Sequence, residues 1–184
     1  EMAVLFGHVS VGITLILFAA TTAMRGPNDH HDVPDAFKLF AGLPHIVAIS
    51  DSNHNTIFEC LSAKRTYFDQ EAKEVTYVVF FKGHHGTERK DVAFHVTAGP
   101  TSNKVLFTED EHPDVTEIAE MMYANPRNNC FILQFPYFGK QCILYVSKGL
   151  ENEVPQECTD QFAEICGVAV PAYSQDLCSD DEDL

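Results

Sequence analysis

The chain consists mainly of short strand-like runs in close succession, followed by one helical run. Eight runs recur at intervals of roughly ten to sixteen residues, and apolar residues alternate with polar ones in most of them, as in half-buried strands. Turn-forming residues separate the runs and leave connections of hairpin length. The runs are His45–Ser50, Thr56–Lys64, Glu74–Phe81, Lys90–Thr97, Lys104–Thr108, Thr116–Tyr123, Cys130–Phe135 and Lys140–Ser147. This order predicts an antiparallel up-and-down β-barrel, although the run from Thr116 would fit a helix equally well.

Two helical segments flank these runs. A short helix is expected at Pro34–Phe40, with Pro34 in its first turn and Gly42 at its end. A second helix is expected at Pro155–Gly167, and its apolar stripe must cover the barrel wall. That stripe consists of Cys158, Phe162, Ile165 and Cys166. We therefore predict an all-β fold with accessory helices, an eight-stranded lipocalin barrel whose interior can hold one small ligand.

The first 23 residues have the pattern of an export signal. Gly12–Ala20 is an apolar core, and the small residues Thr21 and Ala23 follow at a suitable cleavage position. The core is short for a membrane span, which needs about 20 apolar residues, so an uncleaved anchor is the lesser alternative. We expect a signal peptide at 1–23, a flexible N-terminus at 24–33, a lipocalin domain at 34–178 and an acidic tail at 179–184.

All six cysteines lie after this leader. An even number of cysteines behind an export signal favours three disulfides and a secreted, extracellular protein. Zinc sites use closely spaced cysteine pairs, and the chain has none. The paired histidines at 30–31 and 84–85 fall in predicted loops without ligand spacing, so no metal site is expected.

Charge and missing motifs disfavour other classes of function. The net charge of −15 repels phosphate backbones and anionic lipid heads, so neither nucleic acid nor a membrane is an expected partner. The sequence has no G-x-S-x-G elbow, phosphate-binding glycine loop or H-E-x-x-H motif. With every cysteine assigned to a disulfide, no thiol nucleophile remains. We expect no catalytic residues, no cofactor and no enzyme activity.

The cysteine spacing and the strand–helix–cysteine order of the last third resemble the salivary lipocalins of ticks, the family of histamine-, serotonin- and eicosanoid-binding proteins. The residues that carry this resemblance are Asn129–Phe135, Cys142–Val146, Val154–Cys158 and Tyr173–Cys178, with weaker likenesses at Phe58–Cys60 and Asp35–Lys38. The resemblance implies disulfides between Cys60 and Cys178 and between Cys130 and Cys158. Cys142 and Cys166 then remain to form the third.

Strand parity supports that third pair and predicts a ligand site. If the aromatic and aliphatic residues beside Cys130 and Cys142 face the barrel interior, both cysteines face outward, toward the covering helix. The predicted ligand-binding residues are Phe131, Leu133, Phe135, Ile143, Tyr145, Tyr77, Val79, Phe94 and Glu59, and Val75, Phe81, Val92 and Val96 should join the inward set. For Glu59 a surface position at a strand end is equally compatible with the sequence.

The expected ligand is small and apolar. Amine-binding members of the family carry an acid directly after the seventh-strand cysteine and another on the eighth strand, where this chain has Phe131 and Ile143. A buried ammonium needs a carboxylate partner, so a histamine or serotonin scavenger is a weaker hypothesis than a carrier of a sterol, fatty acid or eicosanoid. The structural alternative is a barrel that side chains fill completely.

The resemblance also implies a role in suppressing host inflammation or immunity, as in the japanin-like branch. The competing hypothesis is an immunomodulator or complement inhibitor that binds a host immune protein or cell surface through its outer loops. The charged loops at 82–90 and 109–114 are long enough for such contacts.

Overall fold

The computed structural model describes residues 33–178 apart from residue 55 and residues 84–88. The predicted signal peptide at 1–23, the flexible segment at 24–33 except Val33, and the tail at 179–184 lie outside the described residues. So do the histidine pairs at 30–31 and 84–85.

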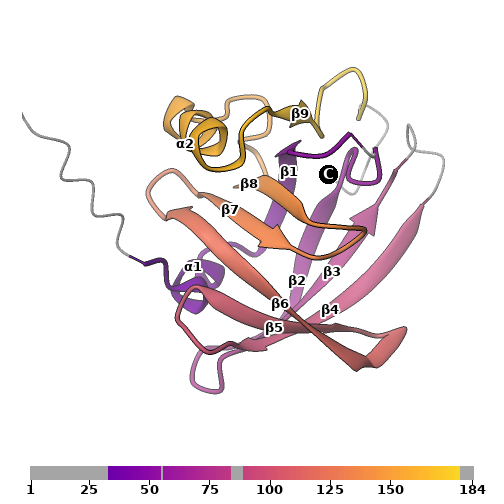
Figure 1. Ribbon diagram of the computed structural model, residues 1–184, viewed down its shortest axis with the longest axis vertical. Coiled ribbons are helices and arrows are strands. Elements are labelled where there is room, and N and C mark those ends of the chain that lie inside the picture. The colour runs from indigo at the N-terminus through magenta and orange to yellow at the C-terminus, as the bar shows by residue number, and fades with distance from the viewer. Residues whose placement is uncertain (1–32, 55, 84–88, 179–184) are drawn as a thin grey trace, which may run out of the picture. The chain divides into compact units, whose positions relative to one another are not determined.

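The strands form one closed antiparallel barrel (Figure 1). Neighbouring strands follow the order β2-β3-β4-β5-β6-β7-β8-β1, and a further pairing between β2 and β1 closes the sheet on itself. The strands are β1 (His45–Asp51), β2 (Ser62–Asp69), β3 (Glu74–Phe81), β4 (Lys90–Ala98), β5 (Lys104–Glu109), β6 (His112–Asn125), β7 (Cys130–Phe135), β8 (Gln141–Ser147) and the short β9 (Val170–Pro171). The predicted eight-stranded up-and-down barrel with two helices is confirmed.

Strand β1 pairs with two different neighbours along one edge. Its first residues pair with β2, where Val47 lies opposite Ser62, and its last residues pair with β9, where Asp51 lies opposite Val170. The backbone N–H of Cys60 donates to the carbonyl oxygen of Ala172 at 2.8 Å. The C-terminal segment therefore completes the wall beyond the point where β2 leaves β1.

The prediction of the second strand at Thr56–Lys64 is wrong in position. Thr56 and Cys60 have φ angles of 39° and 54°, which lie in the left-handed region and interrupt an extended strand. Their segment turns back on itself, and the strand begins only at Ser62. The end of the true strand was missed because Lys64, Arg65, Thr66 and Asp69 leave few apolar residues in Lys64–Asp69 to mark it.

The sixth run is a strand and not a helix. β6 spans His112–Asn125 and pairs with β5 on one side and β7 on the other. The two-residue strand β9 had no sequence signal, because a pairing this short depends on the position of β1.

Helix α1 (Ala36–Ala41) closes one end of the barrel. The Asp35 side chain caps it by accepting a hydrogen bond from the Lys38 backbone N–H at 3.1 Å. Pro34 therefore lies before the cap, two positions ahead of the first helical residue, and not in the first turn as predicted. Phe37 and Phe40 are buried in the same cluster as the side chains of the barrel interior. The Arg65 guanidinium donates to the carbonyl oxygen of Phe40 and ties the helix to β2.

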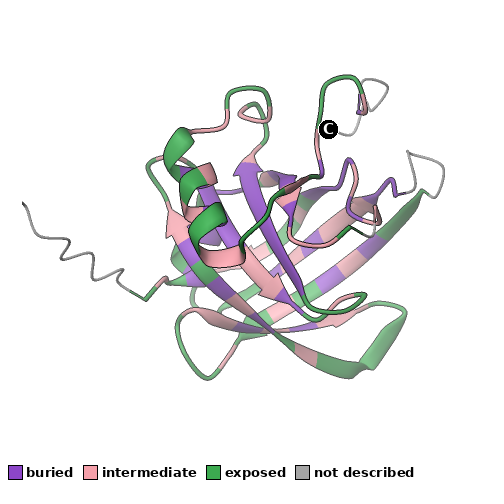
Figure 2. Ribbon diagram, turned by 45° about the horizontal axis from the view of Figure 1, so that its top comes forward, coloured by how far each residue is buried: buried purple, intermediate pink, exposed green. Residues whose placement is uncertain are grey.

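Helix α2 (Gln156–Cys166) packs on the outside of the barrel, and its outward face is exposed (Figure 2). Two disulfides fix it to neighbouring strands, Cys130–Cys158 to β7 and Cys142–Cys166 to β8. The third disulfide, Cys60–Cys178, ties the C-terminal segment to the turn before β2. These are the three pairs that the family resemblance and strand parity implied.

Polar contacts fix the N-terminal end of the same helix. The Tyr123 hydroxyl donates to Glu157 Oε1 at 3.0 Å, and the Asn128 side-chain amide donates to Glu157 Oε2 at 2.9 Å. Because the disulfides and these hydrogen bonds act at both ends of α2, the helix is held firmly against the outside of the barrel wall.

Phe162 is the apolar anchor of α2, with 1% of its surface exposed. Replacing it with alanine should lower the free energy of unfolding by about 3–5 kcal/mol, because it leaves a cavity between helix and wall. Chemical denaturation with the disulfides intact measures this. Phe138→Ala is the matched control: that ring is 58% exposed, and its loss should cost less than about 1 kcal/mol. Equal effects of the two changes would contradict the packing described here.

Candidate functional site

The barrel wall separates two apolar clusters, and the alternation of residues along β7 and β8 assigns side chains to them. Phe131, Ile143 and Tyr145 belong to the cluster inside the barrel. Cys130 and Cys142 belong to the cluster between the outer wall and α2. The inward orientation predicted for the residues beside the cysteines is therefore confirmed.

The inner cluster encloses an apolar cavity of about 90 Å³. Side chains from every strand of the barrel and from α1 surround it. Seven of the predicted ligand-binding residues lie in its lining: Tyr77, Val79, Phe94, Phe131, Leu133, Phe135 and Tyr145. Others that sequence reasoning had not assigned to the site also line it, among them Phe40, Leu61, Ala63, Val105, Phe107 and Ala119. Val105 and Phe107 lie in a strand predicted close to its observed bounds, so its alternation was a signal that could have assigned them to the site.

Two predicted site residues do not line this cavity. Ile143 is fully buried in the inner cluster but lies behind the lining side chains. Glu59 lies in the turn before β2 and not on an inward strand position, because Thr56 and Cys60 break the strand. It lines a small separate space of about 20 Å³ together with Asp51 and Ala172.

The phenol groups of two tyrosines are the polar groups nearest the cavity. The Tyr77 hydroxyl donates to the carbonyl oxygen of Leu43 at 2.6 Å, which holds this ring against the α1 end. Tyr145 stacks on Phe131 with ring centroids 5.0 Å apart. Burial raises the pKa of Tyr145 above its usual value, and the charge of Asp51 raises it further, so the phenol stays neutral and able to donate a hydrogen bond.

Asp51 is the polar residue that sequence reasoning missed. It ends β1, is 4% exposed, and lies opposite Ile143 of β8, so it shares the inner face with that residue. Its Oδ1 atom has no hydrogen-bond partner among the described residues. Parity counted from Ile46 would place Asp51 outside, but a bulge between Ala48 and Ser50 shifts the register and turns it inward.

The electrostatics of Asp51 follow from its burial. Desolvation raises the pKa of its carboxyl to about 6, against the opposing effects of the Ser52 and Asn53 backbone N–H groups. His54 opposes the rise as well. At neutral pH the group is mainly ionised, and an acceptor oxygen without a partner is then buried beside the inner cluster.

The cavity is small for a ligand site. Sites for drug-sized ligands occupy about 300–1,000 Å³, so 90 Å³ accommodates a small guest unless lining side chains move. The lining is rich in aromatic rings, whose rotation changes the free volume. At the end of the barrel away from α1, Phe58 and Tyr137 contact rings of this lining.

The barrel with its two helices defines a lipocalin-type binding protein. The family model described as tick histamine binding protein matches residues 47–179, and the chain therefore belongs to the tick histamine-binding protein family. Comparison with curated proteins finds no match.

Two solved structures share the fold. Japanin from Rhipicephalus appendiculatus, bound to cholesterol, is 16% identical and has a TM-score of 0.53, over 70% of this chain and 90% of japanin. AM182, in a complex with serotonin, is 15% identical with a TM-score of 0.61, over 80% of this chain and 94% of AM182. At these identities the likeness concerns the fold.

Among the described residues, no group of three or more His, Cys, Asp or Glu side chains is placed to share a metal ion. Neither helix in that part of the chain is long and apolar enough to cross a membrane.

Asp51→Asn should change how stability depends on pH. Folded Asp51 keeps its proton up to about pH 6, while an unfolded carboxyl has a pKa of 3.8. The folded state therefore binds more protons between these values, and Asp51 lowers stability as the pH rises through them. From pH 4 to pH 8, the free energy of unfolding of the native protein should fall by about 1–2 kcal/mol more than that of the variant. Denaturation of both proteins at the two pH values measures this. An unchanged difference would mean that the carboxyl is solvated.

Proposed function

We propose that this protein is a secreted carrier that holds a small hydrophobic ligand inside the barrel, and that it is not an enzyme. The enclosed apolar cavity is the observation that supports this most directly. Its lining comes from the inner faces of strands that the disulfides and α2 hold in place, so the space belongs to the folded wall and not to a loop. Membership of a family whose structural neighbours bind small ligands supports the same proposal.

Asp51 favours some classes of small hydrophobic ligand over others. A buried acceptor oxygen is stabilised by a hydrogen-bond donor and repels a second carboxylate. Asp51 lies outside the lining of the inner cavity, so it acts on a ligand only by disfavouring a carboxylate close to this end of the barrel. Of the three classes that the sequence suggests, this supports a sterol, with a hydroxyl as its polar group, over a fatty acid or an eicosanoid with a carboxylate. Burial of apolar ligand surface at about 25 cal/mol per Å² supplies the main part of the affinity.

A biogenic amine is the second candidate, and the same residue favours it. An ammonium in the barrel needs a carboxylate partner, and the family positions for that partner are occupied here by Phe131 and Ile143. Asp51 is a buried carboxylate on a different strand, outside the cavity lining, so an amine would pair with it only after lining side chains move. The small cavity volume also suits an aromatic amine better than a sterol.

The biological role that goes with either ligand is suppression of host inflammation or immunity, by removing or delivering the bound molecule. The competing proposal is an immunomodulator or complement inhibitor that binds a host immune protein through its outer loops. Of the two segments expected to form such a surface, the structure describes 109–114, which includes the turn from β5 to β6, and all of 82–90 except residues 84–88.

Mass spectrometry of organic extracts distinguishes the carrier from the protein-binding immunomodulator. Protein secreted from insect cells should release a co-purifying neutral lipid, or should take up cholesterol from cyclodextrin in near-stoichiometric amounts. Protein that neither retains a lipid nor binds cholesterol or serotonin would rule out the carrier.

Filling the cavity tests where the ligand binds. Ala119 lines the cavity and is buried, so Ala119→Leu should lower affinity for the ligand about tenfold or more, because extra methyl groups occupy the free volume. Ala98→Leu adds the same groups at an exposed position of β4 and should leave affinity unchanged. Titration of both variants with the ligand of the native protein measures this. Equal affinities for the two would place the ligand elsewhere.

Asp51→Asn separates the two ligand classes. The amide cannot neutralise an ammonium, so serotonin affinity should fall by at least about 100-fold, in keeping with the loss of a buried charge partner. Cholesterol affinity should change less than about tenfold, because the amide oxygen still accepts from a hydroxyl. Serotonin binding that persists in the variant would exclude Asp51 as its partner.

A further inference from the structure

A second space lies outside the inner cavity, at the end of the barrel away from α1. It measures about 330 Å³ and is lined by Ile57, Phe81, Gly83, Arg89, Lys90, Tyr137 and Phe138. Phe81 belongs to the lining of both spaces. The two are therefore neighbours, an inner chamber of about 90 Å³ and an outer chamber of about 330 Å³.

The Tyr137 ring separates the two chambers. It lines the outer chamber and contacts three rings of the inner lining. Its centroid is 5.7 Å from that of Phe81, 5.4 Å from that of Phe94 and 6.0 Å from that of Phe135. One residue of the β7–β8 connection thus lines the outer chamber and packs on the rings that line the inner one.

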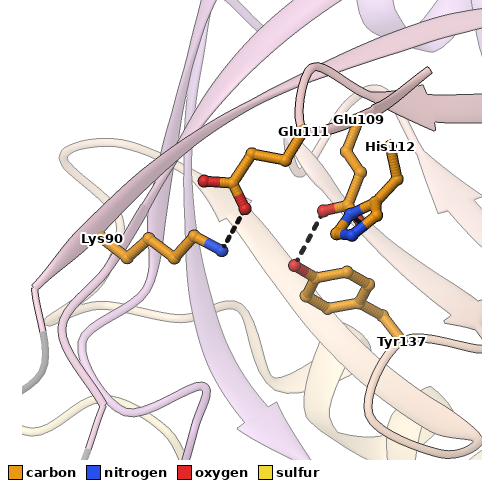
Figure 3. Close-up of polar contacts among 5 residues, drawn as sticks. All are labelled: Lys90, Glu109, Glu111, His112 and Tyr137. Carbon is orange, nitrogen blue, oxygen red and sulfur yellow. Dashed lines mark hydrogen bonds and ion pairs between the residues drawn. The ribbon is translucent and has the colours of Figure 1, made fainter.

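A hydrogen bond to Glu109 fixes the Tyr137 hydroxyl in addition to these ring contacts (Figure 3). Its hydroxyl donates to Glu109 Oε2 at 3.0 Å, from the end of β7 to the end of β5. The other carboxylate oxygen, Oε1, contacts His112 Nδ1 at 3.0 Å, which fixes the acceptor. Glu111 is engaged separately with Lys90 at 2.7 Å. The Glu109 carboxylate that accepts from Tyr137 is therefore oriented by His112 and does not take part in the Glu111 ion pair.

Beyond that bond, ring contacts and the Gln141 side chain hold the connection that carries Tyr137. Phe138 has a φ of 52°, an uncommon angle for a bulky side chain, and is 58% exposed. The Gln141 side chain donates to the carbonyl oxygen of Phe138 at 2.9 Å, which holds the far end of the connection. The Tyr137 end depends on ring contacts and on Glu109.

We propose that Tyr137 is a gate, latched by Glu109, and that the full ligand site consists of both chambers joined when this gate opens. This inference rests on the proposed carrier function and specifies its ligand: an elongated molecule with an apolar body in the inner chamber and a polar end near Lys90, which lines the outer one. Such a ligand has its polar end at Lys90 and not at Asp51. Together the chambers reach the size of ordinary ligand sites. A ligand short enough for the inner chamber binds behind the closed gate.

The gate predicts an effect that depends on ligand length. Tyr137→Phe keeps the ring but removes its hydrogen bond to Glu109. The closed state then loses the net stabilisation of that one hydrogen bond relative to the open state. A long ligand binds only the open state, so its affinity should rise about three- to tenfold. A short ligand should bind with unchanged affinity but exchange faster. Hexanol and hexadecanol, the latter delivered from cyclodextrin, serve as the two probes in NMR titrations.

The controls use matched substitutions elsewhere. Tyr173→Phe removes a hydroxyl that contacts Asn152 on another part of the surface, and it should change neither affinity. Glu109→Ala should reproduce the effect of Tyr137→Phe, while Glu111→Ala should not. The double variant of Tyr137→Phe and Glu109→Ala should gain no more than either single change, because both remove one bond.

Equal effects of Tyr137→Phe on the two alcohols, or additive effects of the two single changes, would overturn the gate and leave the carrier proposal intact. Failure of both alcohols to bind the native protein and every variant would overturn the carrier and the gate together.

Discussion

The alternation of side chains across β7 and β8 is the constraint on which the remaining structure depends. Each side chain on a strand points to one face of the sheet. The side chains at inward positions therefore fill the barrel, while those at outward positions pack against α2. Cys130 and Cys142 occupy outward positions and are bonded to α2. Their neighbours Phe131 and Ile143 are thereby fixed inward. The disulfides thus stabilise the wall and also determine which side chains of β7 and β8 face the cavity.

The same constraint explains what the sequence predicts and what it does not. Regular strands such as β3 and β7 were predicted at their observed bounds, because alternation and turn residues agree there. The second strand was misplaced because the φ angles of Thr56 and Cys60 are set by a turn that the disulfide to Cys178 holds. Asp51 was missed because one bulge in β1 reverses its face. Irregularities of this kind depend on contacts between distant segments, and a local pattern does not contain them.

The barrel interior is closed at one end and has its mouth at the other. Helix α1 and the Tyr77 contact with Leu43 close the first end, while Phe58 and Tyr137 fill the second. The polar groups at the mouth, Asp51 and Glu109, come from the ends of different strands. Under the proposed carrier function, apolar fit along the barrel axis and hydrogen bonding near the mouth select the ligand.

The central claim is that the inner face of the wall, and no other apolar surface, receives the ligand. Methyl NMR of protein labelled at Ala, Ile, Leu and Val tests it during titration with cholesterol or serotonin. The account predicts shifts at the inward methyl groups of Ala63, Ala119 and Leu133, with those of Ile132 and Leu144 on the α2 side unchanged. Shifts confined to the α2 side, with the inward methyl groups unaffected, would contradict it.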